Sequence, residues 1–301
     1  MPMEHQLGST TTTRVISQEF GYAAPSTLED ALALLDEHGD SLTPLAGGTD
    51  LLLQLKTDQR SERNLMYINE LEALDGITET SDRVELGATV TYDDLIHSPV
   101  VRRELPILAE AAGDAGGVQI EQMGTLGGNL CNASPAASAA PPLLVHDASV
   151  TLESADGERV VALEDFFTGP KQTVLRPNEL LTGVRVPKTD AERWAHEEVK
   201  RVTEDLAKAI VSVVFERDGD TVVDCRIALG CLAPVPVRAS EAEAALQGEP
   251  ADETAFRRAG ERAKADVNPI TDARSTAEYR ELITETKVRD LLMEANDTHG
   301  N

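Results

Sequence analysis

The sequence predicts an α+β protein built from three units in series. Its 301 residues exceed the usual length of one compact domain. Some segments have apolar residues at helical spacing, and they alternate with segments in which every second residue is apolar, as in a β-strand. Asp-Gly pairs join some of these strand-like segments, as in β-hairpins. Aromatic residues make up only 3% of the chain, so aliphatic side chains must fill the core. We expect a flexible tail over residues 1–17, then units over residues 18–75, 76–190 and 191–301.

The unit over residues 18–75 opens with a capped helix. Ser26 stands at the N-cap position and Glu29 follows three residues later, which is the spacing of a capping box, and Gly39 ends the helix. A short apolar strand then leads into a tight turn at Gly47 and Gly48. The segment "LLLQL" follows this turn as a second element.

The middle unit begins with a strand, because apolar residues alternate over residues 84–90. Two helical stretches follow, divided near Pro99 and Pro106. A glycine-rich, uncharged loop over residues 124–138 comes next, and a hairpin with its turn at Asp156-Gly157 closes the unit.

The unit over residues 191–301 combines a second hairpin with helices. The hairpin turns at Asp218-Gly219, between two runs rich in β-branched residues. Three amphipathic helices are expected over residues 238–246, 253–266 and 277–296.

The chain is strongly acidic, with 53 acidic and 27 basic residues and a net charge of −26. Nucleic acids and acidic membranes require a basic patch on their partner, and no such patch is present, so we expect neither. The acids are spread along the whole chain. A halophilic host explains this spread, because molar salt shortens the screening length to roughly 3 Å and removes most of the self-repulsion.

Several classes of protein are excluded by absent patterns. No apolar segment reaches about 18 residues and no signal-peptide pattern occurs, which predicts a cytoplasmic protein without a membrane span. Cys131, Cys225 and Cys231 form no CxxC pair and are too few for an iron–sulfur cluster. The six histidines lie outside the glycine-rich loops, so we expect neither a metal site nor catalytic side chains.

Two Gly-Gly loops, residues 45–50 and 125–134, are the candidate binding elements. Glycine lets backbone N–H groups converge on phosphate oxygens without a formal positive charge. Threonine, asparagine and serine side chains add neutral donors, so the lining suits a diphosphate with polar sugar groups. Each loop by itself is more often an ordinary turn, and neither matches the Walker or GxGxxG pattern.

Four segments together carry a family resemblance: "PLAGGTDLLLQLK", "GTLGGNLCNASPAASAAPPLLVHDA", "IALGCLAPVPVRASEAEAAL" and "STAEYRELI". In this order, over residues 18–295, they resemble the FAD-binding medium subunit of molybdenum hydroxylases, the family of carbon monoxide dehydrogenase and xanthine dehydrogenase flavoproteins. The resemblance implies a two-subdomain FAD-binding fold of the PCMH type, followed by a C-terminal domain with a small antiparallel sheet and helices.

The resemblance also implies that both glycine loops cradle the FAD diphosphate and ribityl chain. Leu181 or its neighbour Leu180 would contact the isoalloxazine, with a plain core position as the alternative. Lys200 is a further flavin neighbour by resemblance, with a solvated charge as the alternative. The implied residues in the loops are Leu45, Ala46, Gly47, Gly48, Thr49, Asp50, Thr125, Gly128, Asn129, Asn132 and Ser134.

One position departs from the family pattern. Where the family usually reads SPAAD, this chain reads SPAAS, so Ser138 replaces an acid that often contacts the flavin nucleotide. Serine still hydrogen-bonds but carries no charge. Asp147 is one candidate for a replacement acid nearby, and the sequence leaves this open.

The resemblance implies an oxidoreductase subunit that carries electrons on FAD. A large molybdopterin subunit and a small subunit with two [2Fe–2S] clusters would be its partners, as a dimer of heterotrimers, and NAD, a quinone or another molecule would accept the electrons. A stand-alone flavin oxidoreductase and a nucleotide-binding module without redox activity are the alternatives. The C-terminal family segments argue against both.

Overall fold

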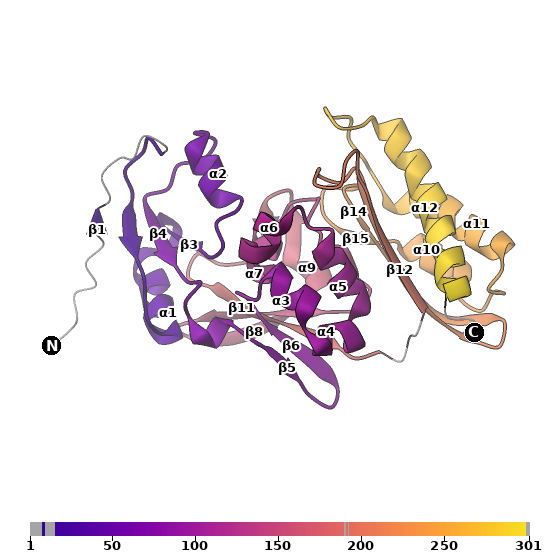
Figure 1. Cartoon of the computed structure of the whole chain (residues 1–301), viewed down its shortest axis with the longest axis horizontal. Coiled ribbons are helices and arrows are strands. Elements are labelled where there is room, and N and C mark those ends of the chain that lie inside the picture. The colour runs from indigo at the N-terminus through magenta and orange to yellow at the C-terminus, as the bar shows by residue number, and fades with distance from the viewer. Residues whose placement is uncertain (1–7, 10–15, 190, 192, 299–301) are drawn as a thin grey trace.

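The computed structural model describes residues 8–9, 16–189, 191 and 193–298, so the tail predicted over residues 1–17 lies largely outside the described residues. The α+β class is confirmed. Three units of sheet and helix follow one another along the long axis of the molecule (Figure 1). The boundaries predicted near residues 75 and 190 fall between the three main sheets and stay predictions.

The first unit is a four-stranded sheet with helices packed on it. Strands β2 and β3 both run parallel to β4, while β1 pairs antiparallel with β2. Apolar residues of α1 pack against this sheet. Leu55 of α2 forms a second cluster with Leu45 of β3 and Leu65 of β4, and α2 lies on the far side of the sheet from α1 (Figure 1). The elements are β1 (Gly8–Ser9), β2 (Gly21–Ala23), α1 (Leu28–His38), β3 (Leu42–Leu45), α2 (Leu51–Lys56) and β4 (Asn64–Tyr67).

The cap of α1 differs by one residue from the prediction. Thr27, not Ser26, is the N-cap, because its backbone is extended and its Oγ1 accepts the Asp30 N–H at 3.1 Å. The Thr27 hydroxyl also donates to the Asp30 carboxylate at 2.8 Å, so Asp30 takes the place predicted for Glu29. The predicted end at Gly39 is confirmed, with φ +48° at that glycine.

The middle unit is a five-stranded antiparallel sheet with helices packed on it. Its strands lie in the order β5, β6, β11, β7, β8. The predicted breaks are confirmed, since Pro99 and Pro106 each begin a new helix, but they separate three helices, α3, α4 and α5, where two stretches were predicted. The predicted strand over residues 84–90 is shorter, because the chain leaves the sheet at Gly87, where a Cβ would lie 2.2 Å from the Leu74 carbonyl oxygen.

The elements of the middle unit follow one another closely along the chain. A small two-stranded ribbon, β9 with β10, lies beside the main sheet. The elements are β5 (Ile77–Glu79), β6 (Arg83–Gly87), α3 (Tyr92–His97), α4 (Pro99–Glu104), α5 (Pro106–Gly113), α6 (Val118–Met123), α7 (Leu126–Cys131), α8 (Ala140–Leu144), β7 (Ser149–Ser154), β8 (Gly157–Ala162), α9 (Leu163–Phe166), β9 (Phe167–Gly169), β10 (Gln172–Thr173) and β11 (Leu180–Pro187).

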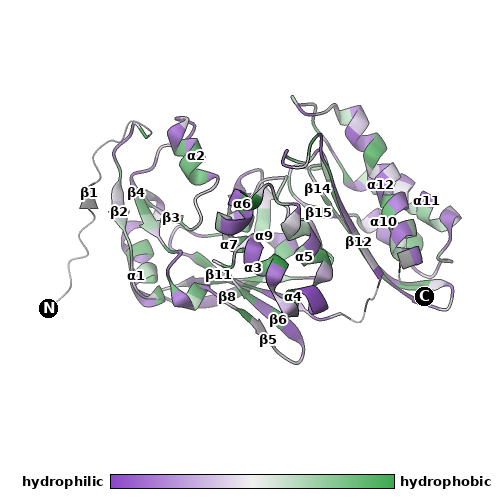
Figure 2. Ribbon diagram, in the orientation of Figure 1, coloured by the Kyte–Doolittle hydropathy of each residue, from purple (hydrophilic) through white to green (hydrophobic). Residues whose placement is uncertain are grey.

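The C-terminal unit is a four-stranded antiparallel sheet with helices on one face, as predicted. The other face packs on the middle unit through Trp194, Val214 and Ala228. Figure 2 shows apolar and hydrophilic residues mixed within each helix, as expected for helices with one face on a sheet and one in solvent. The elements are β12 (Arg193–Val199), β13 (Ala209–Asp218), β14 (Thr221–Gly230), β15 (Val237–Arg238), α10 (Ser240–Leu246), α11 (Glu253–Ala263) and α12 (Ala277–Thr298).

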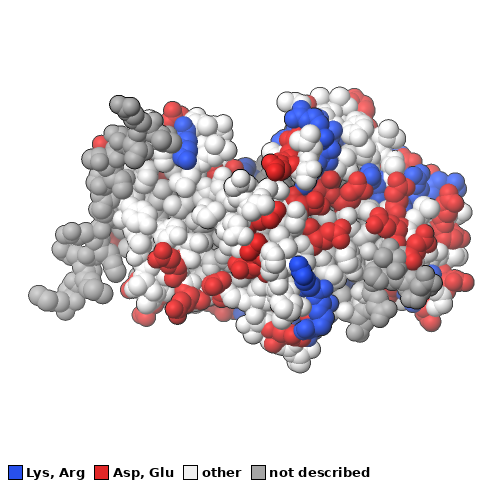
Figure 3. Space-filling view, viewed as in Figure 1, with Lys and Arg blue, Asp and Glu red and all other residues white. Residues whose placement is uncertain are grey.

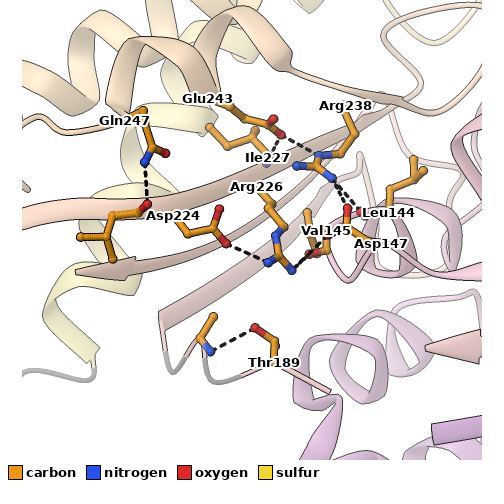
Figure 4. A network of polar contacts seen from close by, with 12 residues as sticks. Leu144, Val145, Asp147, Thr189, Asp224, Arg226, Ile227, Arg238, Glu243 and Gln247 are labelled. Atoms are coloured by element: carbon orange, nitrogen blue, oxygen red, sulfur yellow. Dashed lines mark hydrogen bonds and ion pairs between the residues drawn. The ribbon is translucent and has the colours of Figure 1, made fainter. Parts of the chain in front are cut away.

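Two arginines of the C-terminal sheet anchor it to the middle unit (Figure 4). Arg238 donates to the Asp147 carboxylate at 2.7 Å and to the Leu144 carbonyl oxygen at 3.2 Å. Arg226 lies 3.4 Å from both the Asp147 carboxylate and the Val145 carbonyl oxygen. Because these contacts join different domains, they fix the C-terminal sheet against the middle unit. Within the described chain, no helix combines the length and apolarity needed to cross a bilayer.

Candidate functional site

A cavity of about 1130 Å³ opens where the three units meet. Its lining comes from residues 35–68, 88–181 and 198–207, so each unit contributes a wall. In the space-filling view the molecule is hollowed between the part that carries α2 and the C-terminal sheet (Figure 3). The volume slightly exceeds the upper end of the ordinary range for ligand pockets, roughly 1,000 Å³, and so suits an elongated cofactor.

The predicted cofactor residues gather in this cavity, with one exception. Lys200 does not line it and lies behind the wall. The residues that do line it are Leu45, Ala46, Gly47, Gly48, Thr49, Asp50, Thr125, Gly128, Asn129, Asn132, Ser134, Ser138 and Leu181.

The first glycine loop presents a run of available backbone donors. It leads from the end of β3 to α2, and Gly48 has φ +68°, a conformation that glycine adopts at little cost. None of the N–H groups of residues 46–50 donates to a backbone carbonyl of the described chain. Backbone N–H groups in the wall of a cavity normally have an acceptor. The N–H groups of residues 46–50 are therefore available to bind an anionic ligand.

Gly47 lets the first loop touch the middle unit. A Cβ at Gly47 would lie 1.6 Å from the carbonyl oxygen of Met123, the last residue of α6. No side chain fits at that distance. The close approach of the two backbones therefore joins the first loop to the segment that precedes the second loop, and it closes the cavity on this side.

The second glycine loop was predicted as irregular and is instead the short helix α7. Thr125 caps it, and the Thr125 Oγ1 accepts the Gly128 N–H at 3.1 Å. A Cβ at Gly127 would lie 2.7 Å from the Ala88 carbonyl oxygen, so glycine permits the helix to pack there. The N–H groups of residues 126–129 all have acceptors within the chain. This loop therefore offers a ligand its side chains, whereas the first loop offers its backbone.

The side chains around α7 form a polar corner of the cavity. Asn129 accepts the Ala139 N–H at 3.3 Å and lies beside the Tyr92 hydroxyl. Tyr92 is 4% exposed, and burial raises the pKa of its hydroxyl. Tyr92 therefore stays neutral at physiological pH and acts here as a hydrogen-bonding group.

Glu198, and not Asp147, places an acid beside Ser138. The Ser138 hydroxyl lies beside the Glu198 carboxylate and favours a lower pKa of that group, while Asp147 is paired with Arg226 and Arg238 outside the cavity. Glu198 comes from β12 and lines the cavity. Glu198 of β12 thus provides a carboxylate in the corner of the cavity where Ser138 lacks one.

Lys200 holds Glu198 in place. Its Nζ lies 3.0 Å from Glu198 Oε2 and donates to the Asp114 carbonyl oxygen, and the lysine side chain is 7% exposed. Burial raises the pKa of the Glu198 carboxyl, and the Ser138 hydroxyl and the Lys200 charge oppose that rise. Lys200 therefore supports the cavity wall and does not form it.

The cavity fits a diphosphate cofactor despite its acidic lining. Most of the lining carboxylates have a salt-bridge partner, which reduces their repulsion of an anion. The available N–H groups of the first loop and the neutral side chains near α7 supply the hydrogen bonds that FAD requires. The lining acids are Asp40, Asp50, Glu62, Asp114, Glu179, Glu198, Glu204 and Asp205, and the lining bases are Arg60, Lys171 and Arg176.

The sequence-based reasoning missed Lys171, Glu198 and Tyr92 as lining residues. One signal for Glu198 exists: with His196 it alternates at period two, which places the two side chains on one face of β12. Lys171 and Tyr92 carry no comparable signal, since each is an isolated residue in a turn or a short helix.

Comparison with known proteins identifies the family of the chain. The family model for the FAD binding domain in molybdopterin dehydrogenase matches residues 18–189, and the model for the CO dehydrogenase flavoprotein C-terminal domain matches residues 194–295. The carbon monoxide dehydrogenase medium chain of Hydrogenophaga pseudoflava is 35% identical over 267 residues, covering 88% of this chain and 93% of the relative. A putative xanthine dehydrogenase FAD-binding subunit of Escherichia coli K12 is 32% identical over 278 residues, covering 91% and 95%.

Solved structures show the same fold. A carbon monoxide dehydrogenase chain from Hydrogenophaga pseudoflava superposes with a TM-score of 0.89 at 37% identity, covering 92% of this chain and 96% of that one. Quinoline 2-oxidoreductase from Pseudomonas putida 86 superposes with a TM-score of 0.87 at 26% identity, covering 92% and 96%. The chain therefore belongs to the FAD-binding medium subunits of the carbon monoxide dehydrogenase and xanthine dehydrogenase family, which are oxidoreductase subunits with FAD as cofactor.

Proposed function

We propose that this chain binds FAD in the cavity between its three units and uses it to pass electrons within a molybdenum hydroxylase complex. Electrons would arrive from the [2Fe–2S] clusters of a small subunit and leave to NAD, a quinone or another acceptor. A large molybdopterin subunit would oxidise the substrate, and the complex would be a dimer of heterotrimers. Relatives of this chain belong to carbon monoxide, glyceraldehyde and xanthine dehydrogenases, so in this proposal the large subunit selects the substrate.

The composition of the cavity wall is the observation that carries this proposal. Among the described lining residues there is no histidine, and the Cys131 thiol has no base beside it, so the wall offers binding groups and no nucleophile with its base. Bound FAD supplies the redox chemistry. The first loop would bind the diphosphate through its N–H groups, while Asn129, Ser138 and Glu198 would orient the polar remainder.

The need for a partner follows from the cysteines. Cys131, Cys225 and Cys231 are free, and no group of three or more candidate metal ligands occurs among the described residues. An iron–sulfur cluster requires four such ligands, so in this proposal another chain carries the clusters and supplies the electrons. Three free thiols also favour the reducing environment of the cytoplasm, which we propose as the location.

The test is a reduction experiment on the complex, purified with its partner subunits in high salt and freed of oxygen. Substrate is added, and flavin absorbance is followed separately from that of the iron–sulfur clusters. We expect both to bleach in the complex, whereas the FAD-loaded chain alone stays oxidised. A complex stripped of FAD is the control, and its clusters should be reduced without passing electrons to the acceptor.

Two outcomes would contradict the proposal. If the isolated chain turns over a small substrate, it is a stand-alone flavin oxidoreductase. If the stripped complex reduces the acceptor at the full rate, FAD lies outside the electron path.

We also propose that the acidic surface is an adaptation to salt. Patches of acidic side chains are spread over the face in Figure 3, and the net charge is −26. Raising KCl from about 0.1 M to about 1 M shortens the screening length from roughly 10 Å to 3 Å and should raise the melting temperature by on the order of 10 °C. Sucrose is the control, because it stabilises proteins by exclusion without screening charge. An equal rise in both solutes, or none in KCl, argues against a charge effect.

A further inference from the structure

Lys171 lies in the turn between β9 and β10 in an uncommon backbone conformation. Its φ is +62°, and its N–H donates at 2.8 Å to the carbonyl oxygen of Ala133, which itself has φ +45°. Residues other than glycine rarely adopt this left-handed region, and they persist there only where the surroundings hold them. The direction in which the Lys171 side chain leaves the backbone is therefore fixed by its contact with the segment after α7.

The Lys171 ammonium bridges the two glycine loops. Its Nζ donates to Asn132 Oδ1 at 2.6 Å and lies 3.3 Å from Asp50 Oδ2. Asp50 ends the run of available N–H groups in the first loop, and Asn132 follows α7. The Lys171 and Asp50 side chains are 52% and 46% exposed, and an ion pair this exposed is weak, so its partners can be exchanged.

The other two bases of the lining are placed differently. Arg60 pairs with Glu62, and Arg176 lies 3.8 Å from the buried carboxylate of Glu179. Within the described chain, neither arginine side chain bonds a residue of the two glycine loops. Lys171 is thus the cation that stands beside the groups suited to a diphosphate.

We propose that Lys171 is the counter-cation of the FAD diphosphate. When FAD binds, its diphosphate replaces the Asp50 carboxylate as the partner of the Lys171 ammonium group. This rests on the proposed placement of FAD in the cavity. The glycine loops supply neutral hydrogen bonds, and the lining is acidic, so a dianionic group needs a local positive charge to bind there. Lys171 supplies this charge from a third segment of the chain, and Asp50 holds the ammonium in position when no cofactor is bound.

The test compares FAD affinities by quenching of flavin fluorescence, at one KCl concentration in which all variants are folded. Lys171→Gln should weaken FAD binding about tenfold, because one charge-assisted hydrogen bond is lost. Lys171→Arg should restore most of the affinity. Asp50→Asn should tighten binding, since the competing carboxylate is removed. Lys264→Gln is the matched control, because Lys264 pairs with Glu285 at similar exposure but lies in the C-terminal unit.

The competing explanation is that Lys171 merely latches the two loops together. A latch requires both partners, so Asp50→Asn and Lys171→Gln would then weaken FAD binding alike, and the proposal would be overturned. It is also overturned if Lys171→Gln binds FAD as tightly as Lys264→Gln does. ADP has the diphosphate but no flavin, and its affinity can be measured by competition with FAD. Lys171→Gln should lower the affinity for ADP by the same factor as the affinity for FAD.

A further variant separates this proposal from the placement of FAD. If Gly47→Val binds FAD with wild-type affinity, the cofactor lies outside the cavity, and both the placement and the role of Lys171 fail. If Gly47→Val loses FAD while Lys171→Gln keeps it, the placement stands and the counter-cation is wrong.

Discussion

The Gly47→Val chain is expected to fold and to be purified without FAD. A Cβ at this position would lie 1.6 Å from the Met123 carbonyl oxygen, so the first loop must move away from α6. That movement displaces the N–H groups of residues 46–50 that we assign to the diphosphate. Forcing a side chain into so close a contact costs about 1–3 kcal/mol of folding free energy, which a domain of this size tolerates.

The measurement is the amount of FAD released per chain, with circular dichroism to confirm folding. Gly113→Ala is the control, because a Cβ there has nothing within 4 Å, and this chain should keep its FAD. Retention of stoichiometric FAD by folded Gly47→Val would remove the first loop from the binding site. Bulky residues at Gly48 and Gly128 should also lower FAD retention, through strain at φ +68° and through a clash 2.7 Å from the Thr125 hydroxyl that caps α7.

Mild acid is expected to destabilise the protein through two buried histidines. His146 is 4% exposed, and neither of its ring nitrogens has a hydrogen-bond partner among the described residues. Burial and the Arg226 charge lower the pKa of His146 to about 4. His196 is 6% exposed and contacts Ser212 Oγ at 2.9 Å through Nδ1, and burial with the Lys200 charge lowers its pKa to about 3. Both histidines are therefore neutral in the folded protein at pH 7.

The sign of the pH effect follows from these values. In the unfolded chain each histidine titrates near pH 6.5, so the unfolded state takes up protons first as the pH falls. The stability they contribute is complete above pH 6.5 and is lost progressively between pH 6.5 and pH 3 to 4. Between pH 7 and pH 5 the two residues together should cost about 4 kcal/mol of unfolding free energy.

Urea unfolding at pH 7 and pH 5, in constant KCl, measures this loss. The informative quantity is the difference in unfolding free energy between pH 7 and pH 5, because the effect of each substitution on stability at a fixed pH cancels in this difference. His146→Leu and His196→Gln should each reduce that difference by about 2 kcal/mol. If neither variant changes it, other groups cause the acid sensitivity.

The sequence predicted elements well where local chemistry determines them. Pro99 and Pro106 begin helices as their geometry requires, and Gly39 ends one. The glycine-rich segment 126–131 was wrongly predicted as irregular, because glycine has a low helix propensity. Its helix depends on the Thr125 cap and on close packing against Ala88, and packing of this kind overrides propensity.

The candidate site was predictable only where the residues follow one another in the chain. Both glycine loops belong to short segments whose residues necessarily lie together. Lys171 reaches Asn132 and Asp50 only because the β9–β10 turn packs against the segment after α7, a contact set by the tertiary fold. Lys200 was predicted as a flavin neighbour, but the cavity is lined instead by Glu198, which Lys200 contacts from behind the wall, and the sequence could not show this arrangement.

The three-walled cavity has a consequence for how the protein matures. Because residues 35–68, 88–181 and 198–207 all contribute to the lining, no one unit contains the complete site. The site comes into existence only when the last strands have docked on the middle unit through Arg226 and Arg238. Acquisition of the yellow cofactor would then mark a chain that has finished folding, so a colourless fraction in a preparation identifies molecules in which this final step has failed.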